Sequence, residues 1–374
     1  MIKNYFNKGN AGLREKIFSL DYQLIFLILM LGIISFFAMY STERGNFDYY
    51  TKSHVFRFCI FFLVFIFLGF VNIKFWHRSS YIFYFVVLLL LFAVDFFGIT
   101  ASGSKRWINL YIFNLQPSEL MKITLILFLA RYYNKIPYND VNRIRFMLIP
   151  VVVIFLPFVL VLGQPDLGTA ALILIGGLAV VYLSGFSIKY FTISSLMVIC
   201  LMPVIIAFLK PYQKMRILTF LNPERDPLGA GYQIIQSKIA IGSGGIFGKG
   251  YLMGSQSYLD YLPEKHTDFI FTLFSEEFGF FGSVTLLIVY ALIIYKIYSI
   301  GIQSRNNFGK LFCFGFAASF FLYVSVNMAM VLGLLPIVGA PLPIMSYGGS
   351  SMLAMMIGLG VVMSVKLHGG EEVA

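Results

Sequence analysis

The sequence predicts an all-α polytopic membrane protein, and three observations support this fold class. Of its 374 residues, 59% are hydrophobic and only 12% are charged, whereas a soluble domain usually carries about 25% charged residues. Apolar runs such as residues 20–40, 146–162 and 269–295 reach or approach the roughly 20 residues that a spanning helix needs. The lysines and arginines of the short connections between such runs also gather in alternate loops.

The apolar runs predict ten transmembrane helices within a single domain, residues 1–374. The predicted spans are approximately residues 20–41, 55–71, 81–98, 115–133, 146–163, 167–185, 190–209, 269–297, 310–333 and 346–366. The first span follows a basic segment, residues 1–19, but it is long and lacks a small-residue cleavage site. We therefore interpret it as a retained helix rather than a signal peptide.

The positions of the positive charges predict the orientation of these spans. An even number of spans puts both termini on one side of the membrane, and most basic residues of the short loops fall on that side. The short loops of the opposite side carry only Arg44, Lys52, Lys105 and Arg106. The positive-inside rule then places both termini in the cytoplasm. The net charge of +11 is explained in this way, and we expect no nucleic-acid partner.

Residues 210–268 form the one long connection, and the topology places it on the extracytoplasmic side. Long loops of this kind are usually functional. The loop contains a turn-rich sequence at residues 222–229 and a predicted amphipathic helix around residues 232–241, whose apolar face comprises Tyr232, Ile235 and Ile239. A helix of this kind can lie in the membrane interface.

A glycine-rich sequence follows this helix at residues 242–250. It is similar to a phosphate-binding loop, but it lacks the Walker order of residues and no strand precedes it. We therefore do not predict a nucleotide site.

The sequence LPEKHTDFIFTLF at residues 262–274 joins a charged loop to an apolar helix, and Asp268 is the last charge before that helix. Asp268 is therefore expected at the mouth of whatever the helices enclose. At 100° per residue, Thr272, Ser275 and Gly279 continue a polar and small stripe below Asp268. The stripe is compatible with lining a groove and with packing against another helix.

Three ionisable residues in or beside the spans need a partner or a function, because a charge at the centre of a spanning helix costs roughly 2.5–3.5 kcal/mol even on lenient scales. Glu119 and Lys122 can pair on one face of the fourth span, either neutralising each other or lining a cavity that opens outward. Asp166 lies in the outer turn between spans five and six, where it either caps a helix or belongs to a site.

The last outer loop contains three prolines, Pro336, Pro341 and Pro343, and runs into SYGGS at residues 346–350. Irregular backbone at membrane depth is tolerated where it is buried in protein or faces a water-filled cavity. The alternative is a close contact between helices through small residues. We expect Ser346 and Ser350 to line a cavity near the outer leaflet.

Seven short segments together carry a pattern typical of one family. They are Arg106-Trp107, QPSE at 116–119 with Lys122, QPDLGT at 164–169, DPLGAGY at 226–232, QSKIAIGSGG at 236–245, PEKHTDF at 263–269 and SYGGS at 346–350. In these segments, and in their order, the chain resembles the SEDS family of membrane proteins (shape, elongation, division and sporulation). The resemblance extends over nearly the whole chain. The segment at residues 236–245 is similar to the elongation branch of the family rather than to the division branch.

The resemblance implies ten transmembrane helices, with the long extracytoplasmic loop between spans seven and eight. It implies polymerisation of lipid II into glycan strands at the outer face of the cytoplasmic (inner) membrane during cell elongation. The substrates would be lipid II and the lipid-linked glycan. The protein partners would be a class B penicillin-binding protein, which is a transpeptidase, and other membrane proteins of the elongation complex. The essential aspartate of the family matches Asp268.

For this reaction we expect Asp268 to be the general base that activates the acceptor hydroxyl. The pyrophosphate of the leaving group requires cations, and His266 is either a second proton carrier or a hydrogen-bonded loop residue. The substrate-binding candidates are Arg106, Trp107, Arg216, Lys238, Lys249, Lys265 and His266. The cavity-lining candidates are Glu119, Lys122, Asp166, Ser346 and Ser350. A divalent cation, Mg²⁺ or Mn²⁺, is compatible with the reaction, and the sequence identifies no ligands for it.

Three other functions share parts of this pattern. A flippase for lipid II would also need a cavity, charges inside the membrane and broken helices, but its cavity would open to both faces, whereas the polar motifs here gather toward the outer side. A division-type polymerase would catalyse the same reaction. A scaffold without catalytic activity would share only the fold.

Overall fold

The computed structural model describes residues 12–101, 104–109, 114–208, 211–226, 229–255 and 262–371. Its elements are α1 (Leu13–Phe18), α2 (Tyr22–Thr42), α3 (Tyr49–Phe70), α4 (Ile73–Phe97), β1 (Ile99–Ala101), β2 (Ser104–Asn109), β3 (Asn114–Leu115), α5 (Pro117–Asn134), η1 (Tyr138–Asp140), α6 (Ile144–Gly163), α7 (Leu167–Leu183), α8 (Ile188–Phe208), α9 (Pro211–Leu221), η2 (Pro223–Arg225), α10 (Ala230–Ser243), α12 (Ile270–Gln303), α13 (Asn307–Val331) and α14 (Gly349–His368).

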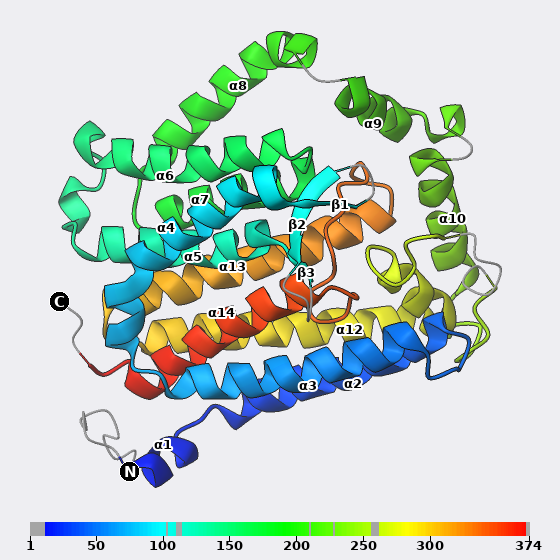
Figure 1. Ribbon diagram of the computed structural model, residues 1–374, viewed down its shortest axis with the longest axis horizontal. Coiled ribbons are helices and arrows are strands. Elements are labelled where there is room, and N and C mark those ends of the chain that lie inside the picture. The colour runs from blue at the N-terminus through cyan, green and yellow to red at the C-terminus, as the bar shows by residue number, and fades with distance from the viewer. Residues whose placement is uncertain are drawn as a thin grey trace.

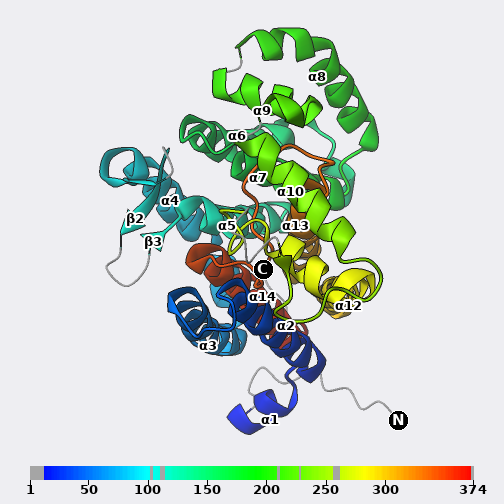
Figure 2. The ribbon, with the colours of Figure 1, turned by 90° about the vertical axis from the view of Figure 1, so that its right-hand side faces the viewer.

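The long helices form a bundle in which α2, α3, α12, α13 and α14 run along one common direction (Figure 1). Helix α1 and the C-terminal end of α14 lie at one end of this bundle, and α10 and the small sheet lie toward the other. We call the second end the outer end, because the sequence places residues 210–268 outside the cytoplasm. Figure 2 shows the sheet and α10 on opposite flanks of the bundle when it is viewed toward this end.

Each of the ten predicted spans coincides with a helix, namely α2–α8 and α12–α14. Within the described residues, seven helices are long and apolar enough to cross a membrane, and they are α2, α3, α4, α6, α12, α13 and α14. Helix α7 is shorter, and α5 is long enough but less apolar. The exact number of spans therefore stays a prediction.

Some helices extend well beyond the apolar runs. Helix α4 begins at Ile73 rather than near residue 81, because Asn72 caps it by accepting a hydrogen bond from the Lys74 backbone (2.8 Å). The first two turns of α4 carry charged side chains, so the apolar run in the sequence begins only after them. Helix α12 likewise continues to Gln303.

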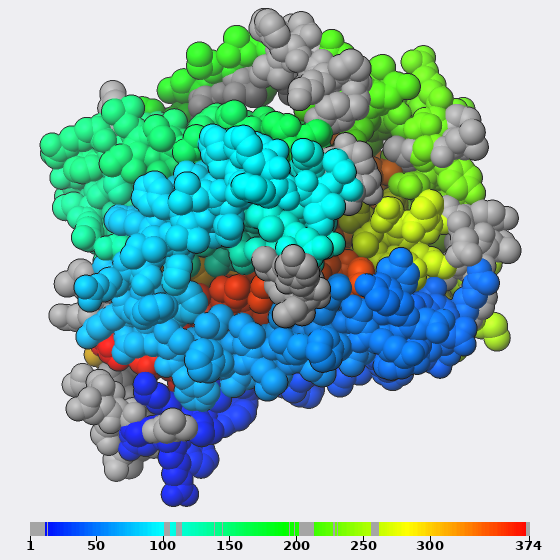
Figure 3. Space-filling view, in the orientation of Figure 1, coloured from blue at the N-terminus to red at the C-terminus, as the bar shows by residue number. Residues whose placement is uncertain are grey.

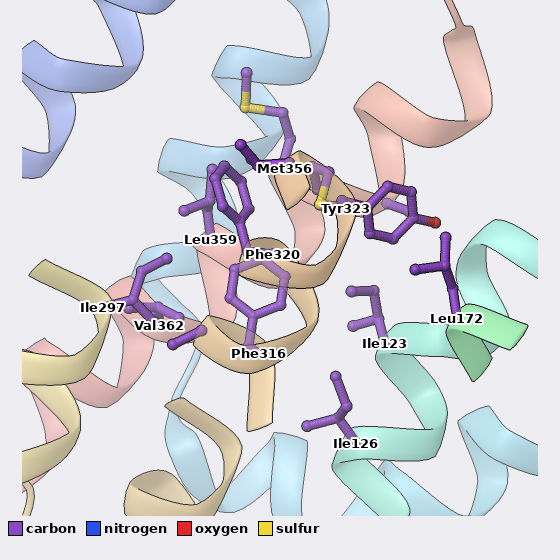
Figure 4. Packing of buried hydrophobic residues seen from close by; sticks show 14 of the residues in the cluster. Ile123, Ile126, Leu172, Ile297, Phe316, Phe320, Tyr323, Met356, Leu359 and Val362 are labelled. Atoms are coloured by element: carbon purple, nitrogen blue, oxygen red, sulfur yellow. The ribbon is translucent and has the colours of Figure 1, made fainter. Parts of the chain in front are cut away.

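The core is built around α13 and α14. Figure 4 shows Phe316 and Phe320 of α13 between Leu359 and Val362 of α14 on one side and Ile123 of α5 on the other. Because lipid is as apolar as these side chains, association of the helices depends on close packing rather than on burial from water. A Cβ on Gly358 would lie 2.2 Å from the Phe316 ring, so this glycine lets α13 and α14 approach.

The outer end contains elements that the sequence did not predict. Strands β1, β2 and β3 form an antiparallel sheet in the order β1-β2-β3, with Trp107 opposite Ile99 and Ile108 opposite Leu115. These strands are two to six residues long and too short for a clear alternation. Helix α9 was also missed. The sheet places Arg106 and Trp107 beside the start of α5.

The predicted helix at residues 232–241 is present as α10, and its position in the membrane interface stays a prediction. Ile234, Ser237 and Ala240 are buried, whereas Ile239 is 48% exposed. The Ser237 hydroxyl pairs with the Thr272 hydroxyl of α12 (2.7 Å) and donates to the Val331 carbonyl of α13 (2.7 Å). Packing against α12 and α13 therefore determines which face is buried. The same contact shows that the polar stripe of α12 packs against a helix at Thr272.

Candidate active site

Asp268 lies in the turn that precedes α12, two residues before the helix begins. Its backbone is fixed by Asn327, which is fully buried in α13. The Asn327 amide nitrogen donates to the carbonyl oxygens of Asp268 (2.9 Å) and Ala340 (2.7 Å). Because both neighbours only accept hydrogen bonds, the nitrogen rather than the oxygen of this amide must face them. One side chain thus ties the loop of Asp268 to the irregular segment before α14.

The SYGGS sequence provides a second connection to the same loop. The Ser346 hydroxyl donates to the Thr267 carbonyl (2.6 Å) and accepts from the Leu342 backbone (2.7 Å). The Tyr347 backbone donates to the His266 carbonyl (2.8 Å). The predicted candidate Ser346 is therefore buried and supports the backbone beside Asp268 rather than lining an open cavity.

The surroundings of Asp268 disfavour its charge. Burial, together with the nearby carboxylates of Glu264 and Asp166, raises the pKa of Asp268 to about 7, although Arg216 opposes this shift. The structure therefore brings together three predicted site residues, Asp268, Asp166 and Arg216, although they lie on different elements. An aspartate with a pKa near neutral is suited to accept a proton.

Asp166 combines the two roles that the sequence left open. Its Oδ1 caps α7 by accepting a hydrogen bond from the Thr169 backbone (3.2 Å). Its Oδ2 accepts from the Gln116 amide (3.1 Å) and lies 3.7 Å from Arg106 Nη1. Arg106 also donates from Nε to the Gln164 carbonyl (3.1 Å). A single carboxylate thus connects the sheet, α5 and α7.

Ser350 extends this network to the start of α14. Its hydroxyl accepts from the Gln116 backbone (2.9 Å) and donates to the Asn114 carbonyl (2.8 Å). Trp107 is half-buried on β2, next to Arg106. The motifs that are far apart in sequence therefore meet at the outer end of the bundle.

Glu119 and Lys122 form the predicted pair, with 2.7 Å between Oε1 and Nζ and side chains that are each 3% exposed. Tyr323 of α13 completes the cluster. Its hydroxyl donates to Glu119 Oε2 (3.0 Å), and its ring lies 4.1 Å from Lys122 Nζ. The cluster is enclosed between α5 and α13, which favours mutual neutralisation over direct contact with a substrate.

Four further substrate-binding candidates, all lysines or arginines, differ in their surroundings. Lys249 pairs with Glu276 (2.6 Å). Lys265 is buried, and Lys238 is exposed beside Gly333, at the end of α13. Arg216 lies on α9, and its charge lowers the pKa of Asp268 against the larger raising effects of burial, Glu264 and Asp166.

His266 is a hydrogen-bonded loop residue. Its Nδ1 pairs with the Thr42 hydroxyl (2.7 Å), and its ring stacks on Tyr50 with 4.1 Å between centroids. Tyr50 in turn contacts Tyr347 edge-on (5.0 Å), and the Arg57 guanidinium lies over Tyr347 (4.8 Å). This arrangement ties α2 and α3 to the SYGGS sequence.

Sequence reasoning missed Asn327, Tyr323 and Tyr50. A lone asparagine inside an apolar span is itself a signal, since polar residues at membrane depth usually have a partner. The tyrosines carry no comparable signal, because aromatic residues are common throughout these helices.

In the described residues no three or more His, Cys, Asp or Glu side chains gather as a possible metal-binding group. The side chains there do not supply a preformed ligand set for Mg²⁺ or Mn²⁺. The positive charge available for a pyrophosphate group therefore comes from arginine and lysine side chains.

Comparison with known proteins agrees with this arrangement. Residues 18–370 match the Cell cycle protein family of FtsW, RodA and SpoVE. The peptidoglycan glycosyltransferase MrdB of Escherichia coli strain K12 is 46% identical over 288 residues, which are 76% of this chain and 77% of MrdB. Stage V sporulation protein E of Bacillus subtilis is 34% identical over 281 residues, which are 75% of this chain and 76% of that protein.

Two solved structures are similar over most of their length. A chain of a peptidoglycan synthase complex that coordinates polymerization and crosslinking aligns with a TM-score of 0.80 and 33% identity, over 93% of this chain and 97% of that one. The rod shape determining protein RodA of Thermus thermophilus aligns with a TM-score of 0.70 and 26% identity, over 93% and 96%. The chain belongs to the FtsW/RodA/SpoVE, or SEDS, family of polytopic membrane proteins.

Proposed function

We propose that this protein is a peptidoglycan glycosyltransferase that polymerises lipid II into glycan strands during cell elongation, with Asp268 as its general base. The observation that carries the proposal is the position of Asp268. Its carboxyl group has a pKa of about 7 and its backbone is tied to Asn327 and Ser346. The similarity to MrdB, which exceeds that to the relatives named for FtsW or sporulation, supports the elongation role.

In this reaction the 4-hydroxyl oxygen of the acceptor sugar attacks the anomeric carbon of the lipid-linked donor strand. The new bond joins this oxygen to that carbon, and the bond from the carbon to the pyrophosphate oxygen breaks. Direct displacement inverts the anomeric configuration, so an α-linked donor gives a β-1,4 bond. The hydroxyl proton passes to the Asp268 carboxylate. The fixed backbone on both sides of Asp268 supplies the positioning on which such a step depends.

The leaving group carries negative charge that cations must offset. Arg216 is a cation whose charge lowers the pKa of Asp268, and Arg106 lies on the sheet beside Asp166. We assign the diphosphate to this side of Asp268. Lys238 and Lys265 remain candidates for contacts with the sugar chain or the lipid headgroup.

The lipid carrier has to reach this site from the bilayer. Figure 3 shows a hollow between α3 and α4, through which the surface of α14 is visible. A prenyl chain lying there would keep its diphosphate at the outer end of the bundle. The protein would act in the cytoplasmic membrane, because the lipid carrier of its proposed substrates lies in that bilayer.

We also propose a transpeptidase partner of the class B penicillin-binding protein type, together with other elongation proteins. The similarity to a chain of a complex that joins polymerization to crosslinking supports this assignment.

The test is polymerisation of fluorescent lipid II by the purified full chain, with and without its transpeptidase partner. We expect glycan ladders from the wild-type protein and none from Asp268→Ala, with cooperative thermal unfolding of both proteins showing that each is folded. Transport of lipid II across vesicle membranes without any polymer would instead support the flippase. Ladders of normal intensity from Asp268→Ala would exclude Asp268 as the base.

A further inference from the structure

Helix α12 is interrupted at Gly279, where φ is 63° and ψ is −158°. The break separates a half-helix, residues 270–278, from the longer remainder, and it leaves backbone groups on both sides without helical partners. The glycine-rich loop, residues 244–250, supplies those partners. Four backbone hydrogen bonds bridge the break: Lys249 N to Glu276 O (3.0 Å), Gly250 N to Glu277 O (3.1 Å), Phe280 N to Gly245 O (2.9 Å) and Phe281 N to Ile246 O (3.2 Å).

The glycines of the loop are explained by this contact rather than by a phosphate. A Cβ on Gly248 would lie 2.0 Å from the Glu277 carbonyl oxygen, and one on Gly244 would lie 2.3 Å from the Ser275 carbonyl oxygen. Gly279 itself would place a Cβ 2.3 Å from the Gly248 nitrogen. Two backbones therefore approach each other more closely than any side chain permits.

An ion pair adds to the backbone contacts. Lys249 Nζ lies 2.6 Å from Glu276 Oε1, and the Ser255 backbone and hydroxyl donate to the same oxygen (3.0 and 2.9 Å). The Glu276 side chain is fully buried. A buried carboxylate on the half-helix is thus neutralised by a lysine of the loop, and removing that lysine would leave the charge unpaired.

The opposite end of the half-helix carries Asp268. That end is held by Asn327 and Ser346, and the end at the break is held by the loop. Glu276 follows Asp268 by eight residues, which is about 12 Å along a helix axis. Lys249 and Glu276 therefore act on the half-helix as a whole rather than on the reacting atoms.

We propose that the loop of residues 244–250 and the Lys249–Glu276 pair hold the half-helix at the angle that places Asp268 against the acceptor hydroxyl. In this view, Lys249 and Glu276 are positioning residues, and Lys249 is not a ligand of the diphosphate. The inference rests on the proposed function for its effect on rate, whereas its effect on the half-helix is independent of any activity.

The test compares four variants of the full chain with the wild type, one of them the conservative change Lys249→Arg. Gly248→Ala forces the loop away from the half-helix. The double variant Lys249→Met/Glu276→Gln removes the ion pair without leaving a buried charge. Gly242→Ala is the matched control, because a Cβ there meets nothing within 4 Å. The readouts are amide hydrogen exchange in the peptide of residues 262–281, and kcat, KM and the pH profile of lipid II polymerisation.

For Gly248→Ala and the double variant we expect faster exchange, a kcat lower by about 10- to 100-fold, a nearly unchanged KM and a shifted pH midpoint. Lys249→Arg should keep most of the wild-type rate, and Gly242→Ala should match the wild type.

Faster exchange with an unchanged kcat and pH profile would contradict the positioning role. Unchanged exchange with a raised KM would contradict it too, since Lys249 would then contact the substrate. If the wild-type protein makes no polymer, the proposed function is refuted. The exchange data would still test whether the loop of residues 244–250 holds the half-helix in place.

Discussion

At the scale of single residues, the proposed role of Asp268 as the general base predicts how activity depends on pH. Its folded pKa of about 7 lies above the ordinary value of 3.8, so below pH 7 the base is increasingly protonated. We expect kcat/KM, which reports the free enzyme, to fall about tenfold per pH unit below a midpoint near 7. The measurement is the initial rate of lipid II polymerisation between about pH 5.5 and 8.5. A rate that stays constant down to about pH 5 would show an unperturbed aspartate.

The same shift affects stability, with a defined sign. Because the folded protein binds this proton more tightly than the unfolded chain, the stability due to protonated Asp268 is present below pH 3.8 and is lost as the pH rises to about 7. Asp268→Asn keeps the site neutral at every pH. Its melting temperature should therefore exceed that of the wild type at pH 8, and the difference should shrink toward pH 4. Equal melting temperatures at both pH values would contradict the raised pKa.

The sequence made Asp268 visible because a charge next to an apolar run is conspicuous, and the family resemblance then assigned its role. The neighbours that shift its pKa could not be predicted in this way. Asp166 and Arg216 lie on α7 and α9 or at their ends, and only the packing of the bundle brings their charges toward Asp268.

At the scale of elements, the link between α13 and the loops is open to test. Asn327→Leu removes the donor that holds the carbonyls of Asp268 and Ala340. We expect a loss of about 1–3 kcal/mol of stability and a disproportionate loss of kcat. Phe320→Leu, which thins the α13 core away from the site, serves as the stability-matched control. If both variants lose activity equally, Asn327 contributes only to folding.

The pair of α5 can be tested by a comparison of single and double variants. Lys122→Met leaves Glu119 buried and unpaired beside Tyr323, so we expect a loss of about 3–5 kcal/mol. Glu119→Gln/Lys122→Met should recover most of that stability and, for a purely structural pair, most of the activity. Thermal unfolding and polymerisation rates provide the measurements. A stable but inactive double variant would instead indicate a role in the reaction.

The positions of the spans followed from hydropathy, but the first two turns of α4, the break in α12 and the packed face of α10 did not. The predicted stripe of Thr272, Ser275 and Gly279 required one continuous helix, whereas α12 is broken at Gly279. The face of α10 that packs against the protein was not predicted, because it contains Ser237, whose partners lie on α12 and α13. The break in α12 and the packed face of α10 both depend on contacts between segments that lie far apart in the sequence, which local periodicity does not report.

At the scale of the whole molecule, the length of the apolar runs and the spacing of charges were sufficient to predict the helical bundle, because a membrane allows few other structures. Positive charge in alternate loops agrees with α1 and the end of α14 lying at one end of the bundle (Figure 1). The small sheet was missed, since its strands are short and their pairing is fixed by the loops that they join.

The convergence of distant motifs at the outer end makes one measurement decisive, namely the initial rate of glycan synthesis by Asp268→Asn at pH 8. This variant preserves the shape of the side chain but replaces one carboxylate oxygen with an NH2 group, so it cannot accept the proton. With folding verified by its melting temperature, we expect a rate at least about 100-fold below that of the wild type. A rate within about tenfold of the wild type would contradict the assignment of Asp268 as the general base.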